Sequence, residues 1–356
     1  MKILILKPTN RKLHFTYMDS SENKTILSDK LFGVASDQEN IIENISDRIH
    51  EIDSFNNPDA VAIRVKYGGE DFNGPVPASP EVISKLENMV SHAPLHIPLV
   101  LELIRECEST FSEIPVILVF ETAFFSCLPP REYGYALKSN LLKDMGIRRF
   151  GYNGIYHGAA SKYIKQKLNR TFYEEDLKIL SICLEPQPEV AAVIGDKPVM
   201  VTSGSTPLEG IPGQTTCGEI DPTIVFTLAH SLNYGPEQIN SILTRESGLY
   251  GLTGKEISYE ELWNSNDDEV KAAAKVIEYR FLLACGSGIS AMSGLDGIVF
   301  SGKYASAGKI LGKSLIPKLL CGIQHDDVKV DFLEDSLDKI IADEILNVVE
   351  LAESKY

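Results

Sequence analysis

The sequence predicts an α/β protein with a duplicated architecture, in which two domains flank a cleft. Its 356 residues are enough for two domains, since one domain usually has about 100–200 residues. Short apolar runs typical of buried strands occur in both halves and alternate with helical patterns. The second half repeats the order strand, hairpin, loop and helix of the first half. This repetition indicates duplication.

The first half opens with a predicted β-hairpin. Residues 2–6 (KILIL) form an apolar run, and beyond the turn at 8–11 the residues Leu13, Phe15 and Tyr17 alternate with polar neighbours. Alternation of this kind is typical of a half-buried strand.

Two further strands and two helices follow in the first half. Residues 59–65 and 116–120 are predicted strands, the second of the continuous apolar type found in covered sheets. Between them, residues 79–112 carry two helical patterns with a break at 93–98. The strand at 116–120 ends at Glu121, at the edge where open α/β sheets bind ligands.

The second half has its own strands and helices. We place its strands at 179–184, 199–202 and 297–301 and its helices from 222, at 236–244 and at 269–292, with an amphipathic tail at 335–353. A further helix, at about 137–145, precedes the second half. The predicted domains are 1–148, completed by the C-terminal helix at about 336–356, and 149–335.

Charge and composition argue against several classes of partner. The chain has 34 Lys plus Arg against 50 Asp plus Glu, a net charge of -16, and such a protein repels the phosphate backbone, so we expect no nucleic-acid partner. No apolar run approaches the roughly 18 residues of a membrane span, and the opening run is too short for a signal peptide. We expect a cytoplasmic protein without a membrane partner, whose six scattered cysteines are reduced core residues.

Seven short strings along the chain are specific when taken together. They are Arg64–Gly69 (RVKYGG), Ala93–His96 (APLH), Phe120–Phe124 (FETAF), Gly146–Gly151 (GIRRFG), Thr206–Gly210 (TPLEG), Gly218–Pro222 (GEIDP) and Ser247–Gly251 (SGLYG). In this order and spacing they resemble the acetokinase (acetate kinase) family, from the first strand to about Ser301.

The resemblance implies an actin-like, sugar-kinase-like (ASKHA-type) duplicated fold. It also implies a homodimer and a central cleft that holds ATP, Mg²⁺ and a short carboxylic acid. Phosphoryl transfer in such a cleft needs positive charge and hydrogen-bond donors on the equatorial oxygens of the transferred group. The function therefore depends on the residues at each site position.

The resemblance implies a catalytic set that this sequence keeps only in part. Arg64 stands at the first catalytic arginine, and Glu121 replaces an aspartate that orients substrate and magnesium. Asn153 replaces the catalytic histidine, while His157 retains the second histidine. Thr216 occupies the place of the second catalytic arginine. Arg64 could instead form an ion pair at a strand end, and His157 could be a satisfied buried histidine.

The phosphate-facing loops of the family also change. The stretch Lys7–Lys12 replaces an Asn and a Gly-Ser turn, and leaves Lys7 and Asn10 as cofactor-binding candidates. Glu185–Pro188 (EPQP) replaces a Gly-Asn-Gly turn, and prolines with an acidic residue cannot cradle a triphosphate. Gly302 begins what remains of the adenosine loop, and Asp335 roughly replaces a magnesium-associated glutamate.

The small-acid pocket of the family maps to Leu95 with its neighbour His96, to Tyr152, to Pro207 and to Lys66, which replaces a valine. A buried unpaired ammonium group is costly. Lys66 could join Arg64 in binding a more acidic ligand, or it could form a structural ion pair with Glu121 or Glu70. We favour the ion pair with Glu121.

Three functions remain open at this point. The first is an acetokinase homologue that keeps scaffold and cleft but has lost or greatly reduced ATP-dependent acyl phosphate synthesis, and that serves as a binding or regulatory protein. The second is an active kinase for acetate or another short carboxylate, with a rearranged site that uses ATP and Mg²⁺. The third is a binder of small anions or acyl phosphates that needs no nucleotide.

Overall fold

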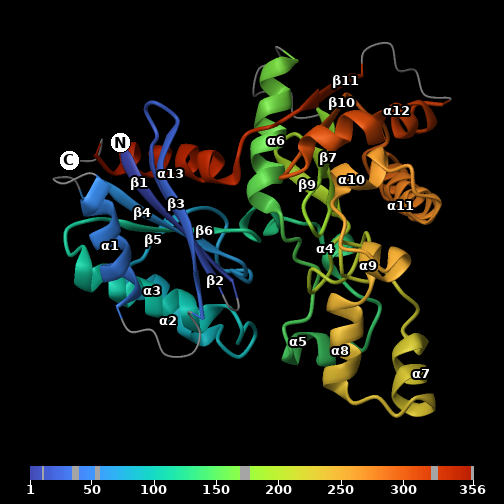
Figure 1. Ribbon diagram of the computed structural model, residues 1–356, viewed down its shortest axis with the longest axis horizontal. Helices are drawn as coiled ribbons and strands as arrows, with labels where there is room; N and C mark the ends of the chain where they lie inside the picture. The colour runs from blue at the N-terminus through green and yellow to red at the C-terminus, as the bar shows by residue number, and fades with distance from the viewer. Residues whose placement is uncertain (10–11, 34–39, 53–56, 169–176, 322–327, 354–356) are drawn as a thin grey trace. The chain divides into compact units, whose positions relative to one another are not determined.

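The computed structural model describes residues 1–9, 12–33, 40–52, 57–168, 177–321 and 328–353 (Figure 1). The chain forms two compact units, the first made of Met1–Ser126 with Ser336–Tyr356 and the second of Cys127–Asp335. The sequence placed the boundary at residue 148, whereas residues 127–148 lie with the second unit. They are held there by bonds such as those from Val201 N to Glu132 Oε1 at 3.0 Å and from Ser205 N to the Tyr135 hydroxyl oxygen at 2.8 Å.

The first unit is built on a six-stranded sheet in the order β3-β2-β1-β4-β6-β5. Its central strands β1, β4 and β6 are parallel, because helical segments connect them, while β2 and β3 form an antiparallel meander with β1. The strands are β1 (Lys2–Thr9), β2 (Lys12–Asp19), β3 (Lys24–Phe32), β4 (Ala60–Val65), β5 (Val76–Pro77) and β6 (Val116–Phe120).

Helices cover both faces of this sheet (Figure 1). Odd-numbered residues of β4 pack into the core under α1 to α3, while α13 contacts β1 and β4. The N-terminus of α2 is fixed by Ser79, whose Oγ accepts a hydrogen bond from Val82 N at 3.3 Å. The helices are α1 (Ile41–Ile52), α2 (Pro80–Asn88), α3 (Ile97–Thr110), the 3₁₀ turn η1 (Ala123–Phe125) and α13 (Leu337–Glu353).

The second unit repeats this plan with five strands in the order β11-β10-β7-β8-β9. Here too an antiparallel meander, β7-β8-β9, continues into parallel strands, β10 and β11. The strands are β7 (Lys178–Cys183), β8 (Glu189–Ile194), β9 (Lys197–Val201), β10 (Gly297–Ser301) and β11 (Lys329–Phe332). The predicted duplication is therefore present, although β3, β5, β8 and β11 were not predicted.

Helices cover the second sheet as well. One face packs under α6, and the other packs under α11, whose start is capped by Asp267. The helices are α4 (Pro130–Tyr133), α5 (Ser139–Asp144), α6 (Gly154–Lys167), α7 (Thr223–Ser231), α8 (Pro236–Arg245), α9 (Gly248–Thr253), α10 (Tyr259–Asn264), α11 (Asp268–Met292), the 3₁₀ turn η2 (Ala305–Ala307) and α12 (Gly308–Leu319).

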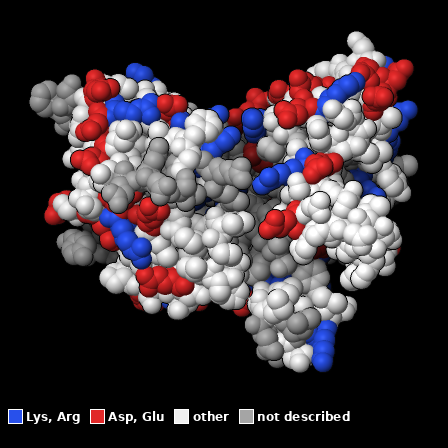
Figure 2. All heavy atoms as spheres, turned by 60° about the horizontal axis from the view of Figure 1, so that its bottom comes forward, with Lys and Arg blue, Asp and Glu red and all other residues white. Residues whose placement is uncertain are grey.

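On the face shown in Figure 2, acidic and basic side chains are interspersed without a single dominant cluster. None of the six cysteines is in a disulfide. Three of them are buried and Cys217 is partly buried, but Cys127 and Cys321 are exposed, so the expectation of core residues is wrong for these two. Within the described ranges, no helix combines the length and apolar character that a membrane crossing requires.

Candidate functional site

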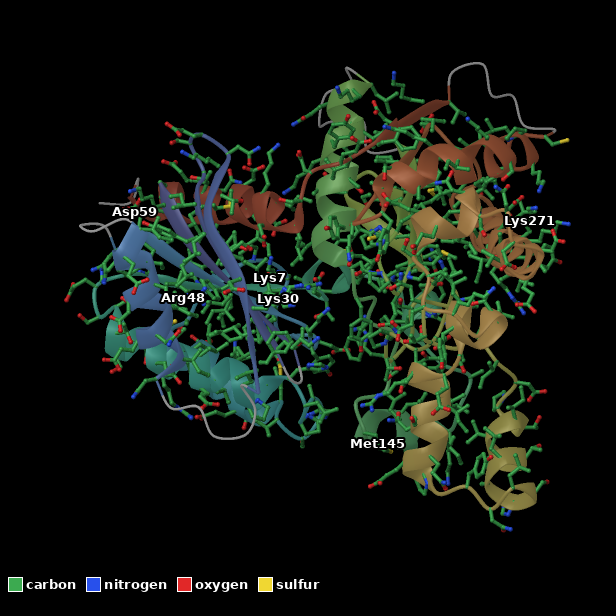
Figure 3. All side chains as sticks on the ribbon, viewed as in Figure 1. Lys7, Lys30, Arg48, Asp59, Met145 and Lys271 are labelled. Carbon is green, nitrogen blue, oxygen red and sulfur yellow. The ribbon has the colours of Figure 1, made fainter. Side chains whose placement is uncertain are left out.

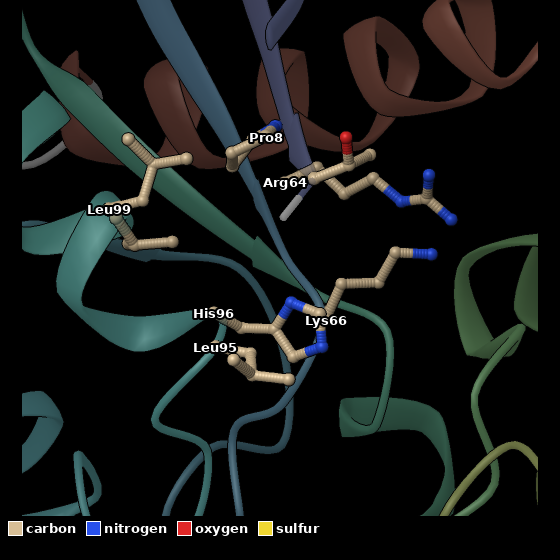
Figure 4. Close-up of a pocket in the computed structure, with 8 residues that line it drawn as sticks. Pro8, Arg64, Lys66, Leu95, His96 and Leu99 are labelled. Atoms are coloured by element: carbon tan, nitrogen blue, oxygen red, sulfur yellow. The ribbon is translucent and has the colours of Figure 1, made fainter. Parts of the chain in front are cut away.

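A pocket in the first unit lies where β1, β4 and the start of α3 meet (Figure 4). Three predicted substrate-binding residues and the predicted catalytic arginine line it, together with apolar and backbone groups. The lining residues are Pro8, Thr9, Arg64, Lys66, Leu95, His96, Leu99 and Val100. Cationic side chains beside an apolar wall suit a small anion that carries a short hydrocarbon part.

Arg64 and Glu121 form an ion pair at the edge of this pocket. Arg64 is the last residue but one of β4, and Glu121 directly follows β6. These two parallel strands end at the same edge of the sheet. Both Nε and Nη2 of Arg64 contact Glu121 Oε1, and the Glu121 side chain is fully buried (0% exposed). The structure thus pairs Glu121 with Arg64, and the ion pair of Glu121 with Lys66 that the sequence favoured stays a prediction.

Lys66 extends beside Arg64 in the same direction, and the ring of His96 lies next to its aliphatic stem (Figure 4). Burial and the nearby Lys66 charge lower the pKa of His96, so the imidazole favours its neutral form. Leu95 is 67% exposed and stands at the rim of the pocket. The apolar wall comes instead from Leu99 and Val100 of α3.

Lys7, a predicted cofactor-binding residue labelled in Figure 3, lies on β1 and forms an ion pair with Asp338 at the start of α13. Thr16 Oγ1 donates a hydrogen bond to the other oxygen of Asp338 at 2.9 Å. The Lys7 ammonium therefore fastens α13 to the sheet. Asn10, the neighbouring cofactor candidate, lies outside the described residues.

The two predicted metal residues belong to different units of the chain. Glu121 is engaged by Arg64, and Asp335 lies in the second unit, just before α13. No group of three His, Cys, Asp or Glu residues in the described ranges is placed to hold an ion.

A second group of predicted residues meets at the N-terminal end of α6, in the second unit. His157 is fully buried, and its Nδ1 lies 2.7 Å from Ser181 Oγ on β7. Its Nε2 lies 3.2 Å from Oε1 of Glu189, the first residue of β8. Glu189 also accepts hydrogen bonds from Asn153 N at 2.9 Å and from Tyr152 N at 3.0 Å.

The carboxylate of Glu189 is stabilised in its charged form. Its complete burial opposes ionisation, but the hydrogen bond and charge of His157 and the bonds from Ser203 and Asn153 outweigh burial and lower the pKa of Glu189. We infer that Glu189 is an anion in the folded protein. This residue and Ser181 were missed in the sequence, where the only available signal was a charged residue opening the apolar run at 190–193.

Gln187 connects the remaining predicted residues of this group. Its backbone oxygen accepts a hydrogen bond from Asn153 Nδ2 at 3.3 Å, and its Nε2 donates to Pro207 O at 3.1 Å. The Tyr152 hydroxyl donates to Ser205 O at 2.5 Å. Tyr152, Asn153, His157 and Pro207 thus lie together in the second unit, while Arg64, Lys66, Leu95, His96 and Glu121 lie together in the first.

The loop between β7 and β8 packs against neighbouring loops of the second unit. Glu185 Oε1 accepts a hydrogen bond from Lys303 N at 2.6 Å, and Pro186 O accepts one from Gln214 N at 2.8 Å. Gly302 has a φ of +91°, and a Cβ added there would lie 2.7 Å from Leu184 O. The predicted cofactor residue Gly302 therefore serves a close approach of two backbones.

Comparison with known proteins agrees with the family resemblance of the seven sequence strings. The sequence matches the Acetokinase family over residues 12–349. It is 32% identical over 295 residues to an acetate kinase of Clostridium novyi (strain NT), covering 80% of this chain and 73% of the relative. An acetate kinase of Halothermothrix orenii is 32% identical over 293 residues, with the same two coverages of 80% and 73%.

Solved structures share the fold. The chain matches a Porphyromonas gingivalis acetate kinase with a TM-score of 0.87 at 21% identity, covering 98% of this chain and 99% of that one. It matches a propionate kinase from Francisella tularensis with a TM-score of 0.83 at 22% identity, covering 96% and 98%. Its fold is the actin-like, sugar-kinase-like fold. The chain belongs to the acetokinase family.

Proposed function

We propose that this protein binds a small carboxylate or another small anion in the pocket of the first unit, and that it has lost or greatly reduced ATP-dependent acyl phosphate synthesis. One observation supports the loss above all. Carboxylates at the two ends of the β7–β8 loop accept hydrogen bonds from backbone N–H groups. Glu185 accepts one from Lys303 N at 2.6 Å, and Glu189 accepts one from Asn153 N at 2.9 Å. A phosphate group needs such backbone donors, and a nearby carboxylate repels the negative charge of a phosphate group.

Two replaced residues add to this argument. Asn153 supplies no positive charge, and its amide is bonded to Gln187 O. Thr216 stands where the resemblance expects an arginine, and its Oγ1 accepts a hydrogen bond from Gly213 N at 3.2 Å. Loss of an arginine that stabilises a transferring phosphoryl group costs about 10³–10⁵ in rate in other enzymes.

The active carboxylate kinase is the second candidate. It is favoured by the pair of Arg64 and Glu121, which stands at the expected strand ends and contributes to the lining and edge of the pocket. Such a kinase would use ATP and Mg²⁺ to phosphorylate a short carboxylic acid.

A hydroxamate assay for acyl phosphate, run with magnesium-ATP and a series of short carboxylic acids, separates the two candidates. Calorimetric titration with each acid in the absence of nucleotide measures the proposed binding, and Arg64→Ala serves as the variant in which binding should fall. We expect acid binding without product. Acyl phosphate formation at a rate comparable with that of the Clostridium novyi acetate kinase would favour the active enzyme.

We also propose that the protein is a cytoplasmic homodimer, joined through apolar side chains of the second unit. No residue of α7 is buried, and its Ile224 and Phe226 are 44% and 62% exposed. On α11 the exposed residues Val276, Tyr279 and Leu283 follow helical spacing along one face. Apolar surface of this kind is typical of a protein interface.

Sedimentation analysis tests the homodimer. Tyr279→Glu should produce monomers, while Phe32→Glu, a matched change of an exposed aromatic residue in the first unit, should leave the dimer intact. A wild-type protein that sediments as a monomer at micromolar concentration would contradict the proposal.

A further inference from the structure

The N-terminal end of α6 has the features of an anion-binding site, but the group that fills it belongs to the chain itself. Two consecutive backbone N–H groups, of Tyr152 and Asn153, and the imidazole of His157 all meet the Glu189 carboxylate. Backbone donors at the start of a helix, together with the helix dipole, favour negative charge. Since α6 has 14 residues, this end of the helix is fully developed.

A second observation comes from the neighbouring strands. Ser301 of β10 pairs with Cys183 of β7, and Cys183 pairs with Glu189 of β8, so the three residues form one row across the sheet. The row faces α6, because Gly297, which shares the face of Ser301, lies against Ile164 of that helix. The Ser301 hydroxyl is fully buried and, among the described residues, has no hydrogen-bond partner.

The direction of α6 brings this hydroxyl toward the same end of the helix. Ile164, in the last part of α6, lies at the beginning of β10, beside Gly297. His157, in the first turn of the helix, lies farther along the neighbouring parallel strand β7, at Ser181. The end of β10, where Ser301 stands, therefore lies toward the start of α6.

We propose that the Glu189 carboxylate is a resident anion in an anion-binding site formed by the start of α6 and His157, with the buried Ser301 hydroxyl on the same face of the sheet, and that removing this carboxylate opens the site to a small oxyanion such as formate or inorganic phosphate. The inference rests on the proposed function in one respect, namely that no external phosphate group uses this end of α6 in the natural protein. Formate has the carboxylate group of Glu189 without the carbon chain that carries it. Phosphate tests whether the site also accepts a larger oxyanion.

The test uses the full chain with Glu189→Ala, which removes the carboxylate and leaves its space. Thermal unfolding is followed against sodium formate and sodium phosphate, with sodium chloride at equal ionic strength as the salt control. We expect either oxyanion to raise the melting temperature of the variant by about 5 °C at a hundredfold excess over its Kd. Glu189→Gln is the matched control, since its amide fills the same space without charge, and it should respond like the wild type to all three salts.

A folded Glu189→Ala protein that responds to formate and phosphate only as it does to chloride would overturn the proposal. If this variant does not fold in chloride, refolding in formate becomes the readout. Recovery of folded protein supports the resident-anion assignment, and failure to recover overturns it. None of these melting and refolding measurements depends on catalytic turnover. A wild-type protein found to synthesise acyl phosphate would therefore refute the proposed function without changing the outcome for the Glu189→Ala variant.

Discussion

Removing the guanidinium of Arg64 should destabilise the first unit more than removing both members of its ion pair. Arg64 is 12% exposed and Glu121 is 0% exposed, so Arg64→Ala removes a guanidinium that faces a buried carboxylate. Loss of one partner from a buried pair costs about 3–5 kcal/mol, whereas replacement of both partners by apolar residues of similar volume is often neutral. We therefore expect Arg64→Ala to cost about 3–5 kcal/mol and the double variant Arg64→Met with Glu121→Leu to cost much less.

Hydrogen–deuterium exchange provides the assay, read over peptides that cover 60–65 and 116–120, the two strands that carry the pair. Peptides from β7 and β10 of the second unit serve as the internal control and should keep their protection. A loss of less than about 1 kcal/mol in Arg64→Ala, the level of an exposed ion pair, would refute the claim that burial makes this pair important. A double variant as unstable as the single one would refute the reasoning about the buried charge.

Three further predictions follow from the charges and the glycine described above. Because the pKa of Glu189 is lowered on folding, its contribution to stability is present above the carboxyl pKa of the unfolded chain and is lost as the pH falls through the folded pKa, so Glu189→Gln should flatten the acid limb of a melting-temperature profile. Asp338→Asn should weaken the attachment of α13 through Lys7 by about 1–3 kcal/mol, which faster proteolytic removal of the C-terminal helix would reveal. Gly302→Ala should cost more than about 2 kcal/mol in urea unfolding, and more than Gly33→Ala, since Gly33 has a comparable positive φ of +80° but nothing within 4 Å of an added Cβ.

The strands that carry continuous apolar runs could be predicted from the sequence, because burial on both faces leaves a pattern that local reading detects. The runs 116–120 and 297–301 are β6 and β10, with the bounds that were expected. By contrast, β3 (Lys24–Phe32) is an edge strand whose side chains are mostly exposed or partly buried, and β8 follows two prolines that indicate a loop. Their pairing depends on neighbours distant in sequence, which no local pattern encodes.

In the candidate site too, some contacts could be predicted from the sequence and others could not. That Arg64 and Glu121 lie at one edge of a sheet could be predicted, since Arg64 stands near the end of one parallel strand and Glu121 directly follows another. That Glu189 meets His157 could not, because the contact requires the register of β7 with β8 and the placement of α6 on that sheet. The engagement of Lys7 by Asp338 likewise depends on α13 returning to the first strand from the far end of the chain.

That return of α13 has a consequence for synthesis on the ribosome. The second unit, Cys127–Asp335, is one continuous stretch inserted into the first, whereas the first unit includes residues from both ends of the chain. Because domains fold as units during translation, the inserted unit can complete its fold while the ribosome still holds the nascent chain. The earlier-made strands β1 and β4 must wait for α13, so the part of the protein that is synthesised first is the last to be finished.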